Sequence, residues 1–186
     1  VLKAKELIEE DGGLEMVKFD FTEWSHVIEK LEKDPIEKER WLLANSTHII
    51  DLAFFFSGTP KELKTVVSGS LDWHPSGQVF AGTGMSEKGV VLSYGSDWGS
   101  AGRWWVELFT PKRKLKLCPV ETVIETIRGT VAENTVEFDG SLDKEYKPGL
   151  FLQTKSFLNG DGRDLKSLDQ LSTEFPFYCQ IAGYES

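Results

Sequence analysis

The chain has 186 residues, which is enough for one well-buried domain and short for two. Its 40% hydrophobic and 27% charged residues are typical of a soluble globular protein. A formal net charge of −9 argues against nucleic acid as a partner, because phosphate backbones are bound mainly by Lys and Arg. No apolar run approaches the roughly 20 residues of a membrane span, so no membrane partner is expected.

The predicted elements begin with a helix over 2–10, which an Asp-Gly-Gly sequence ends. Alternating apolar residues then predict a strand over 14–21. Helical spacing returns in 24–31 and again in 36–43. The N-terminal pattern is charged and amphipathic, unlike a signal peptide.

The segment 45–60 predicts a helix that is apolar almost all round. Asn45 or Ser46 is a candidate N-cap, and the Gly and Pro at the end of the segment supply a stop. Such a helix is normally buried. Its polar residues, His48 and Asp51, therefore need partners or a cavity.

After Pro60 the apolar period changes to two, which is typical of strands. The expected strands cover 63–73, 79–85, 90–97, 103–110, 112–118, 121–128 and 135–139. Their consecutive hairpins indicate a largely antiparallel sheet, and helices are expected to follow at 150–158 and 172–184. We therefore predict a single α+β domain over 1–186, with an open sheet and helices packed on one face.

Motifs for cofactors and metals are missing from the sequence. Gly82-Thr83-Gly84 is followed three residues later by Glu87, so a GxGxxG motif fails, and no P-loop is present. Cys118 and Cys179 form neither a CxxC motif nor a cluster at zinc spacing. They could pair, but two free thiols in a reducing cytoplasm fit them better. We expect a cytoplasmic protein with no metal site and no cofactor bound by this chain alone.

His48 has two interpretations. Spacing alone favours a buried histidine hydrogen-bonded to Asp51, which at i+3 shares its helix face. The alternative is a general acid/base at the floor of a pocket, because imidazole titrates near neutral pH. Asp51 is then either the group that orients His48 or the partner of a basic residue elsewhere.

An aromatic cluster runs from Trp98 to Trp105 around Arg103. Aromatic rings stack on sugars and Arg can clamp a carboxylate or phosphate, so the cluster could be a ligand platform. The simpler interpretation, favoured on the sequence alone, places two Trp residues on opposite faces of one strand. One would then lie in the core and the other in a subunit contact.

The segment 45–60 resembles the helix that opens the C-terminal domain of the Gfo/Idh/MocA oxidoreductase family, the group of glucose-fructose oxidoreductase and inositol dehydrogenase. The family pattern is small-x-x-His-x-x-Asp-Leu, followed by apolar residues, Gly, x and Pro. The matching residues are His48, Asp51, Leu52, Gly58 and Pro60. The order of the predicted elements also agrees with the family over nearly the whole chain.

The resemblance implies the substrate-binding and oligomerisation domain of an NAD(P)-dependent oxidoreductase acting on a sugar, polyol or nucleotide-linked sugar. In the family an N-terminal Rossmann domain carries NAD or NADP, and a Glu-Lys-Pro motif supplies a catalytic lysine. Both would precede Val1, and residues 1–12 would be the end of a linker helix. His48 would then exchange a proton with the substrate hydroxyl.

The predicted substrate-binding residues around His48 are Trp41, Asn45, Thr47 and Arg103, with Asp51 orienting the imidazole. Many family members have Asp four residues before the His, where this chain has Ala44. This departure leaves open a different substrate or reaction. It also leaves open a non-catalytic ligand-binding or structural member of the same fold, and an unrelated α+β ligand-binding domain.

The open face of the predicted sheet favours a homo-oligomer. Trp104, Val106 and Leu108 alternate with Trp105 and Phe109, so both faces of this strand carry large apolar side chains. Helices can cover one face, and the other would be a large apolar patch on a monomer. The resemblance agrees, because the family's sheets pair.

Overall fold

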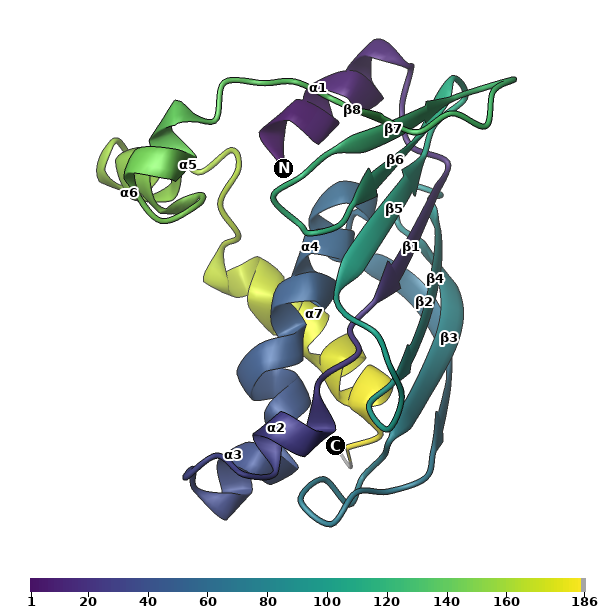
Figure 1. Ribbon diagram of the computed structural model, residues 1–186, viewed down its shortest axis with the longest axis vertical. Coiled ribbons are helices and arrows are strands. Elements are labelled where there is room, and N and C mark those ends of the chain that lie inside the picture. The colour runs from purple at the N-terminus through teal and green to yellow at the C-terminus, as the bar shows by residue number, and fades with distance from the viewer. Residues whose placement is uncertain (185–186) are drawn as a thin grey trace.

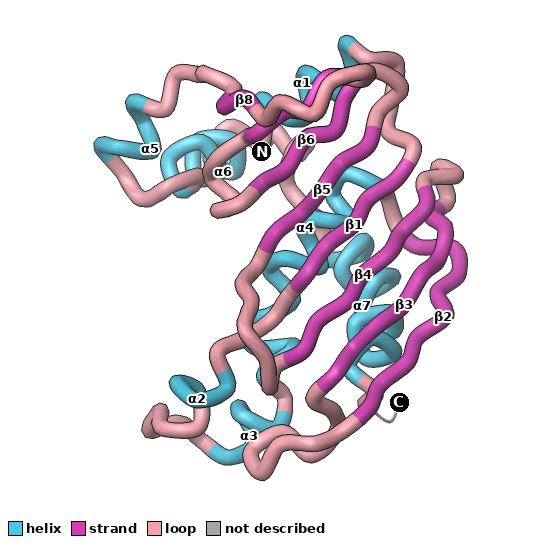
Figure 2. Tube along the Cα trace, turned by 45° about the vertical axis from the view of Figure 1, so that its right-hand side comes forward, coloured by secondary structure: helices cyan, strands magenta, loops and turns pink. Residues whose placement is uncertain are grey.

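The computed structural model describes residues 1–184 and shows an α+β fold. An eight-stranded sheet in the order β2-β3-β4-β1-β5-β6-β7-β8 forms one layer. The helices all lie on one side of this sheet (Figures 1 and 2). The predicted fold class is therefore confirmed.

The strands are β1 (Met16–Asp20), β2 (Pro60–Ser68), β3 (Val79–Ser86), β4 (Val91–Asp97), β5 (Trp105–Phe109), β6 (Arg113–Leu117), β7 (Ile124–Ile127) and β8 (Asn134–Thr135). The helices are α1 (Leu2–Glu10), α2 (Ser25–Ile28), α3 (Pro35–Glu39), the π-helical turn η1 (Leu42–Ser46), α4 (Thr47–Ser57), α5 (Ser141–Glu145), α6 (Leu150–Leu158) and α7 (Leu168–Ala182).

β1 lies inside the sheet, between β4 and β5. It runs antiparallel to β5, with Phe19 opposite Val106, and parallel to β4, with Phe19 opposite Tyr94. The remaining strand pairs are antiparallel. The parallel pair has no hairpin signal in the sequence, because a long connection separates its two strands.

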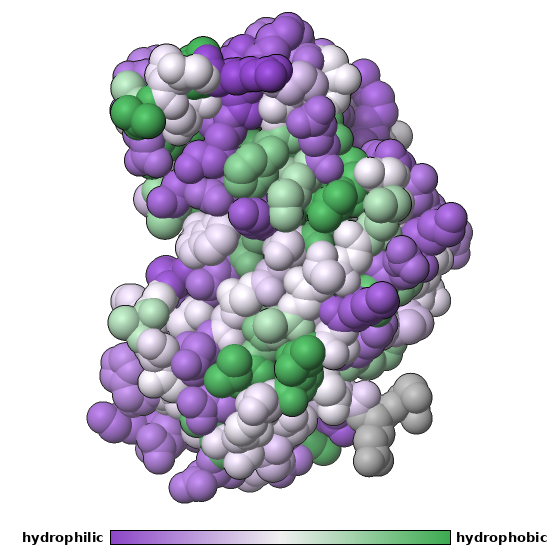
Figure 3. Space-filling model, turned by 90° about the vertical axis from the view of Figure 1, so that its right-hand side faces the viewer, coloured by the Kyte–Doolittle hydropathy of each residue, from purple (hydrophilic) through white to green (hydrophobic). Residues whose placement is uncertain are grey.

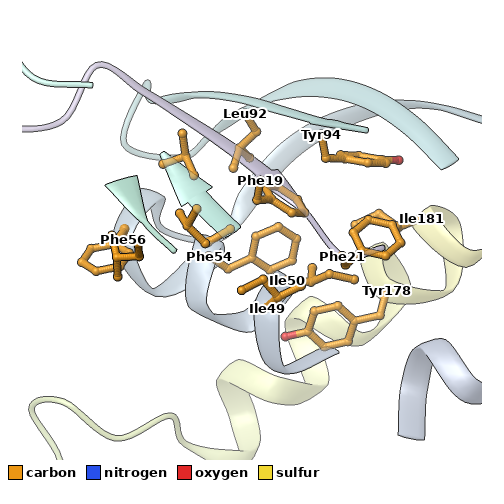
Figure 4. Close-up of a cluster of buried hydrophobic side chains, with 14 of the residues drawn as sticks. Phe19, Phe21, Ile49, Ile50, Phe54, Phe56, Leu92, Tyr94, Tyr178 and Ile181 are labelled. Atoms are coloured by element: carbon orange, nitrogen blue, oxygen red, sulfur yellow. The ribbon is translucent and has the colours of Figure 1, made fainter. Parts of the chain in front are cut away.

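The hydrophobic core lies between the sheet and the helices α4 and α7. Phe54 of α4 stacks on Tyr178 of α7 with ring centroids 5.6 Å apart, and both side chains are almost fully buried. Phe19 of β1 and Ile50 of α4 belong to the same cluster (Figure 4). Each such side chain contributes about 1.5–3 kcal/mol by leaving water. This packing fixes α4 against β1 and β5.

The chain enters α4 without the predicted side-chain cap. η1 runs directly into α4, and the backbone N–H of Thr47 already donates to the Leu42 carbonyl. Because this N–H has a backbone acceptor, Asn45 and Ser46 are free for other contacts, and both donate to Glu23. The predicted end of the helix is confirmed at Gly58, whose φ is +87°.

Other boundaries also differ from the predictions. The strand expected over 63–73 is Pro60–Ser68, and the helix expected over 36–43 is Pro35–Glu39, followed by η1. Only Ser25–Ile28 of the expected helix 24–31 is helical, and the strand expected at 135–139 is reduced to Asn134–Thr135. The last helix begins earlier than expected, because the Ser167 side chain caps it by accepting from the N–H of Gln170.

The open face of the sheet is mixed in polarity, so the expectation of an apolar face is wrong in this respect. Trp105 and Phe109 lie on it half-buried, but Lys18, Glu107 and Lys114 lie among them. The Lys18 Nζ is 5.3 Å from the Phe109 ring centroid, and the Lys114 Nζ is 3.4 Å from Glu107. Figure 3 shows this face as interspersed green and purple groups.

Cys118 and Cys179 are free, as predicted. Burial raises the pKa of the Cys179 thiol, which keeps it protonated near neutral pH. No helix within residues 1–184 is both long enough and apolar enough to cross a bilayer.

Candidate functional site

His48 lies in the first turn of α4 with its side chain exposed, so the interpretation as a buried histidine is wrong. The neighbouring Ile49 and Ile50 face the core, which leaves the imidazole on the outer side of the helix. The indole of Trp104, just before β5, lies 6.4 Å from the imidazole between ring centroids. The imidazole is therefore accessible to a ligand that rests against Trp104.

Glu23, which follows β1, is buried beside η1 with its side chain 3% exposed. Its Oε1 accepts hydrogen bonds from Asn45 Nδ2 at 2.9 Å and Ser46 Oγ at 2.7 Å. Its Oε2 lies 4.0 Å from Nη1 of Arg103. Burial raises the pKa of Glu23 and outweighs the opposing effect of these donors. We call Glu23, Asn45, Ser46 and Arg103 the Glu23 cluster.

Arg103 lies in the loop between β4 and β5, close to two indole rings. Its guanidinium carbon is 4.8 Å from the Trp24 ring centroid and 5.2 Å from that of Trp104. The Arg103 side chain is 54% exposed, so its N–H donors stay accessible. Trp98, by contrast, is buried in the core. The aromatic rings near Arg103 are therefore those of Trp104, within the predicted cluster, and Trp24, outside it.

Two buried indole N–H groups of this region have no hydrogen-bond acceptor within residues 1–184. They are Nε1 of Trp41 and Nε1 of Trp104. Trp41 borders Glu23, although its N–H forms no hydrogen bond of normal geometry. Buried donors in native proteins are nearly always paired, so these two are exceptions to the usual pairing. These two lie beside His48 and the Glu23 cluster.

Three predicted substrate-binding residues, Trp41, Asn45 and Arg103, thus meet around Glu23. The fourth, Thr47, is not part of this group, because its Oγ1 donates to the Leu43 carbonyl at 3.1 Å. Sequence reasoning missed Glu23 itself. Its only sequence signal is an acidic residue beside a Trp at the end of a strand, a pattern that is common on protein surfaces.

Asp51 belongs to a second group of polar residues and forms no hydrogen bond with His48. Its carboxylate contacts Lys166 Nζ and the Tyr178 hydroxyl, and Lys166 also contacts the fully buried Glu174. The Tyr178 hydroxyl donates to Glu174 at 3.0 Å, and burial raises the pKa of Tyr178. We call Asp51, Lys166, Glu174 and Tyr178 the Lys166 cluster. It ties α4 to α7.

The histidine that is buried is His74, in the loop between β2 and β3. Its Nδ1 lies 2.8 Å from the Gly77 carbonyl oxygen, and its Nε2 lies 2.9 Å from the Tyr184 hydroxyl. Burial lowers the pKa of His74. The imidazole therefore joins this loop to the end of the described chain and has a structural role.

The glycines of β3 serve packing and do not fit a phosphate-binding loop. A Cβ at Gly82 would lie 2.5 Å from the Tyr94 ring, and one at Gly84 would lie 2.1 Å from the Glu62 carbonyl oxygen. Gly82 thus lies against β4, and Gly84 lies against β2. This segment therefore offers no cradle for the diphosphate of a nicotinamide cofactor.

Solved oxidoreductases share this fold. A protein provisionally described as an NADPH-dependent oxidoreductase from Desulfitobacterium hafniense matches with a TM-score of 0.70 at 14% identity, over 97% of this chain and 57% of its own. UDP-N-acetylglucosamine 3-dehydrogenase from Acidithiobacillus ferrooxidans matches with a TM-score of 0.63 at 12% identity, over 98% and 58%. Levoglucosan dehydrogenase, solved with NADH and levoglucosan, matches with a TM-score of 0.57 at 16% identity, over 74% and 44%.

The fold is therefore that of one part of a dehydrogenase-type oxidoreductase chain. The protein spans 44–58% of the length of these three solved chains. The fold that the Gfo/Idh/MocA resemblance implies is confirmed. No family model and no curated protein matches the sequence.

Proposed function

We propose that this chain is the substrate-binding part of an NAD(P)-dependent oxidoreductase acting on a sugar, polyol or nucleotide-linked sugar. The observation that carries the proposal is the accessible His48 beside Trp104 and the Glu23 cluster. Structures with the same fold include dehydrogenases named for levoglucosan and UDP-N-acetylglucosamine. Because the matched chains are nearly twice as long, we propose that a nucleotide-binding part accompanies this chain in the whole protein.

In the proposed reaction His48 accepts the proton of the substrate hydroxyl whose carbon is oxidised, and returns it in the reverse direction. The exposed imidazole in the first turn of α4 is suited to this, because histidine is the side chain that most often transfers protons in enzymes. Trp104 and Trp24 offer aromatic surface against which a sugar ring packs. A nicotinamide cofactor, NAD or NADP, supplies the hydride acceptor when bound.

A coupled assay tests this proposal. The whole protein is incubated with NAD or NADP and a panel of neutral sugars, polyols and nucleotide-linked sugars, and reduced cofactor is followed by absorbance. We expect turnover of at least one of these substrates. Failure of the whole panel would favour the alternative of a ligand-binding domain without catalysis. Ala44, exposed one turn before His48 where many family members have Asp, motivates this alternative.

We also propose that residues 1–186 alone bind neither NAD nor NADP tightly, because the glycines of β3 are occupied by packing. Calorimetric titration with NADH and NADPH tests this, and micromolar binding would contradict it. The two free thiols agree with the proposed location in a reducing cytoplasm.

The open sheet face is the proposed contact between two copies of the chain. Trp105 and Phe109 are half-buried on it, and Val66 and Met85 are 65% and 41% exposed. A second copy related by a two-fold axis would bury these side chains. We expect light scattering to give a dimer or larger species and Trp105→Lys to weaken it. A wild-type monomer of 21.0 kDa at tens of micromolar would contradict this proposal.

A further inference from the structure

Glu23 and Arg103 form a pair whose hydrogen-bonding capacity is only partly used within the described chain. Oε1 of Glu23 has two donors, Asn45 and Ser46, whereas Oε2 receives no hydrogen bond from residues 1–184. A carboxylate has about four lone-pair sites, so Oε2 keeps acceptor capacity in a nearly buried position. The 4.0 Å to Arg103 Nη1 is too long for a hydrogen bond.

Arg103 is held in place without being hydrogen-bonded. The rings of Trp24 and Trp104 both lie close to its guanidinium, and Trp24 is itself fixed by a 3.0 Å hydrogen bond from its Nε1 to the Gly102 carbonyl. No hydrogen bond joins Arg103 to the described part of the chain. Its five N–H donors are therefore preorganised by aromatic contacts and available to a ligand.

We propose that Glu23 and Arg103 together recognise two adjacent hydroxyl groups of an uncharged sugar ring. Oε2 of Glu23 accepts a hydrogen bond from one hydroxyl, and the guanidinium of Arg103 donates to the other. The inference rests on the proposed sugar-binding function and defines the substrate class within it.

The chemistry of the pair favours a neutral ring over an anionic one. A hydroxyl both donates and accepts, so two neighbouring hydroxyls satisfy a carboxylate and a guanidinium side by side. A carboxylate or phosphate on the ring only accepts, and the charge of Glu23 repels it at this contact. Glu23 thus prevents Arg103 from acting as a simple anion site.

The pair also lies at the right place in the proposed site. The Trp104 ring centroid lies 5.2 Å from the guanidinium carbon of Arg103 and 6.4 Å from the centroid of the His48 imidazole. A ring bound through Glu23 and Arg103 therefore extends toward the imidazole that removes the proton.

Glu23→Gln is the decisive variant. The Gln carbonyl oxygen can still accept from Asn45 and Ser46, but its NH₂ group replaces the accepting Oε2 with a donor. The probes are methyl β-D-glucoside and methyl β-D-galactoside, which carry trans and cis pairs of adjacent hydroxyls. In calorimetric titrations of the whole protein we expect the variant to bind the better probe roughly ten- to a hundredfold more weakly.

Two further variants complete the design. Glu62→Gln on the exposed part of β2 makes the same charge change away from the site and should leave the dissociation constant unchanged. Arg103→Met removes the guanidinium from an exposed side chain and should weaken binding as Glu23→Gln does. If Glu23→Gln loses the circular dichroism signal of the folded protein, the dissociation constant of Arg103→Met for the neutral glycoside tests the proposal instead.

Methyl β-D-glucuronide distinguishes the two kinds of ligand, because it differs from the glucoside only in a carboxylate. Tighter binding of the glucuronide that depends on Arg103 but not on Glu23 would overturn the proposal. So would unchanged glucoside binding in Glu23→Gln, or no binding of either neutral probe at tens of millimolar. Binding that depends on both residues, without turnover in the coupled assay, would support the inference and contradict the proposed reaction.

Discussion

Two polar clusters border α4 and differ in how completely their groups are satisfied. In the Glu23 cluster, at the start of the helix, one carboxylate oxygen and a guanidinium form no hydrogen bonds within residues 1–184. In the Lys166 cluster, farther along the helix, Lys166 contacts two carboxylates and a phenol, and Thr59 and Gln170 donate to Glu174 as well.

The difference distinguishes the proposed binding site from a structural contact. Buried polar groups are normally paired, and a satisfied network stabilises the arrangement of the elements that contribute to it. The Lys166 cluster is such a network, because it joins α4 to α7. Groups that are held but left unpaired, as in the Glu23 cluster, stay available for a ligand. Single substitutions in each cluster test this division.

His48→Asn should affect activity and leave stability nearly unchanged. Loss of a general acid/base lowers the rate by about 10²–10⁴-fold. The side chain is exposed, so the melting temperature should stay close to that of the wild type. Steady-state kinetics on the whole protein with its best sugar substrate, together with a thermal melt, measure both. Near-normal turnover, or a variant that fails to fold, would refute the acid/base role.

Lys166→Met should lower the stability of the protein and leave sugar binding unchanged. It leaves the carboxylates of Asp51 and Glu174 without their shared cation, and breaking a buried pair in this way lowers the free energy of unfolding by about 3 kcal/mol. Sugar affinity should not change. Urea unfolding gives the stability, with Lys3→Met, in the exposed Lys3–Glu6 pair, as the control that changes it by less than about 0.5 kcal/mol. Equal losses in the two variants would mean that the Lys166 cluster is not a structural contact.

His74 should make the stability pH-dependent. Burial lowers its pKa in the folded state below the ordinary value of 6.5, so the unfolded chain binds a proton first as the pH falls. Its contribution to stability is therefore complete above about pH 6.5 and decreases as the pH falls toward the lowered pKa. Thermal melts at a series of pH values should show this slope, and His74→Gln should flatten it. An unchanged slope in the variant would assign the effect to other groups.

The sequence predicted the elements whose signals are local. The glycine that ends α4 and the alternation in β3, β4 and β5 are read directly along the chain, and the structure has them close to the expected bounds. The resemblance selected His48, but its exposure could not be read from periodicity. The helix around it is apolar, and only the packing of Ile49 and Ile50 against the sheet fixes which side faces out.

The partners of the polar residues could not be predicted, because they are distant in sequence. Asn45 meets Glu23, 22 residues earlier, and Asp51 meets Lys166, 115 residues later. Within α4 the i+3 spacing favoured His48 as the partner of Asp51, whereas α7 and the loop before it supply stronger partners. The parallel pairing of β1 with β4 also joins residues far apart in sequence, such as Phe19 and Tyr94, and could not be predicted for the same reason.

The indole N–H signals test the central claim most directly. Nitrogen–proton correlation spectra of the whole protein are recorded during titration with methyl β-D-glucoside and methyl β-D-galactoside. We predict that the signals of Trp24, Trp41 and Trp104 shift on binding, because these indoles surround the Glu23 cluster. Those of Trp98 in the core and Trp105 on the open sheet face should stay in place. Saturable shifts at Trp105 with none at Trp104 would place the sugar site elsewhere and contradict this account.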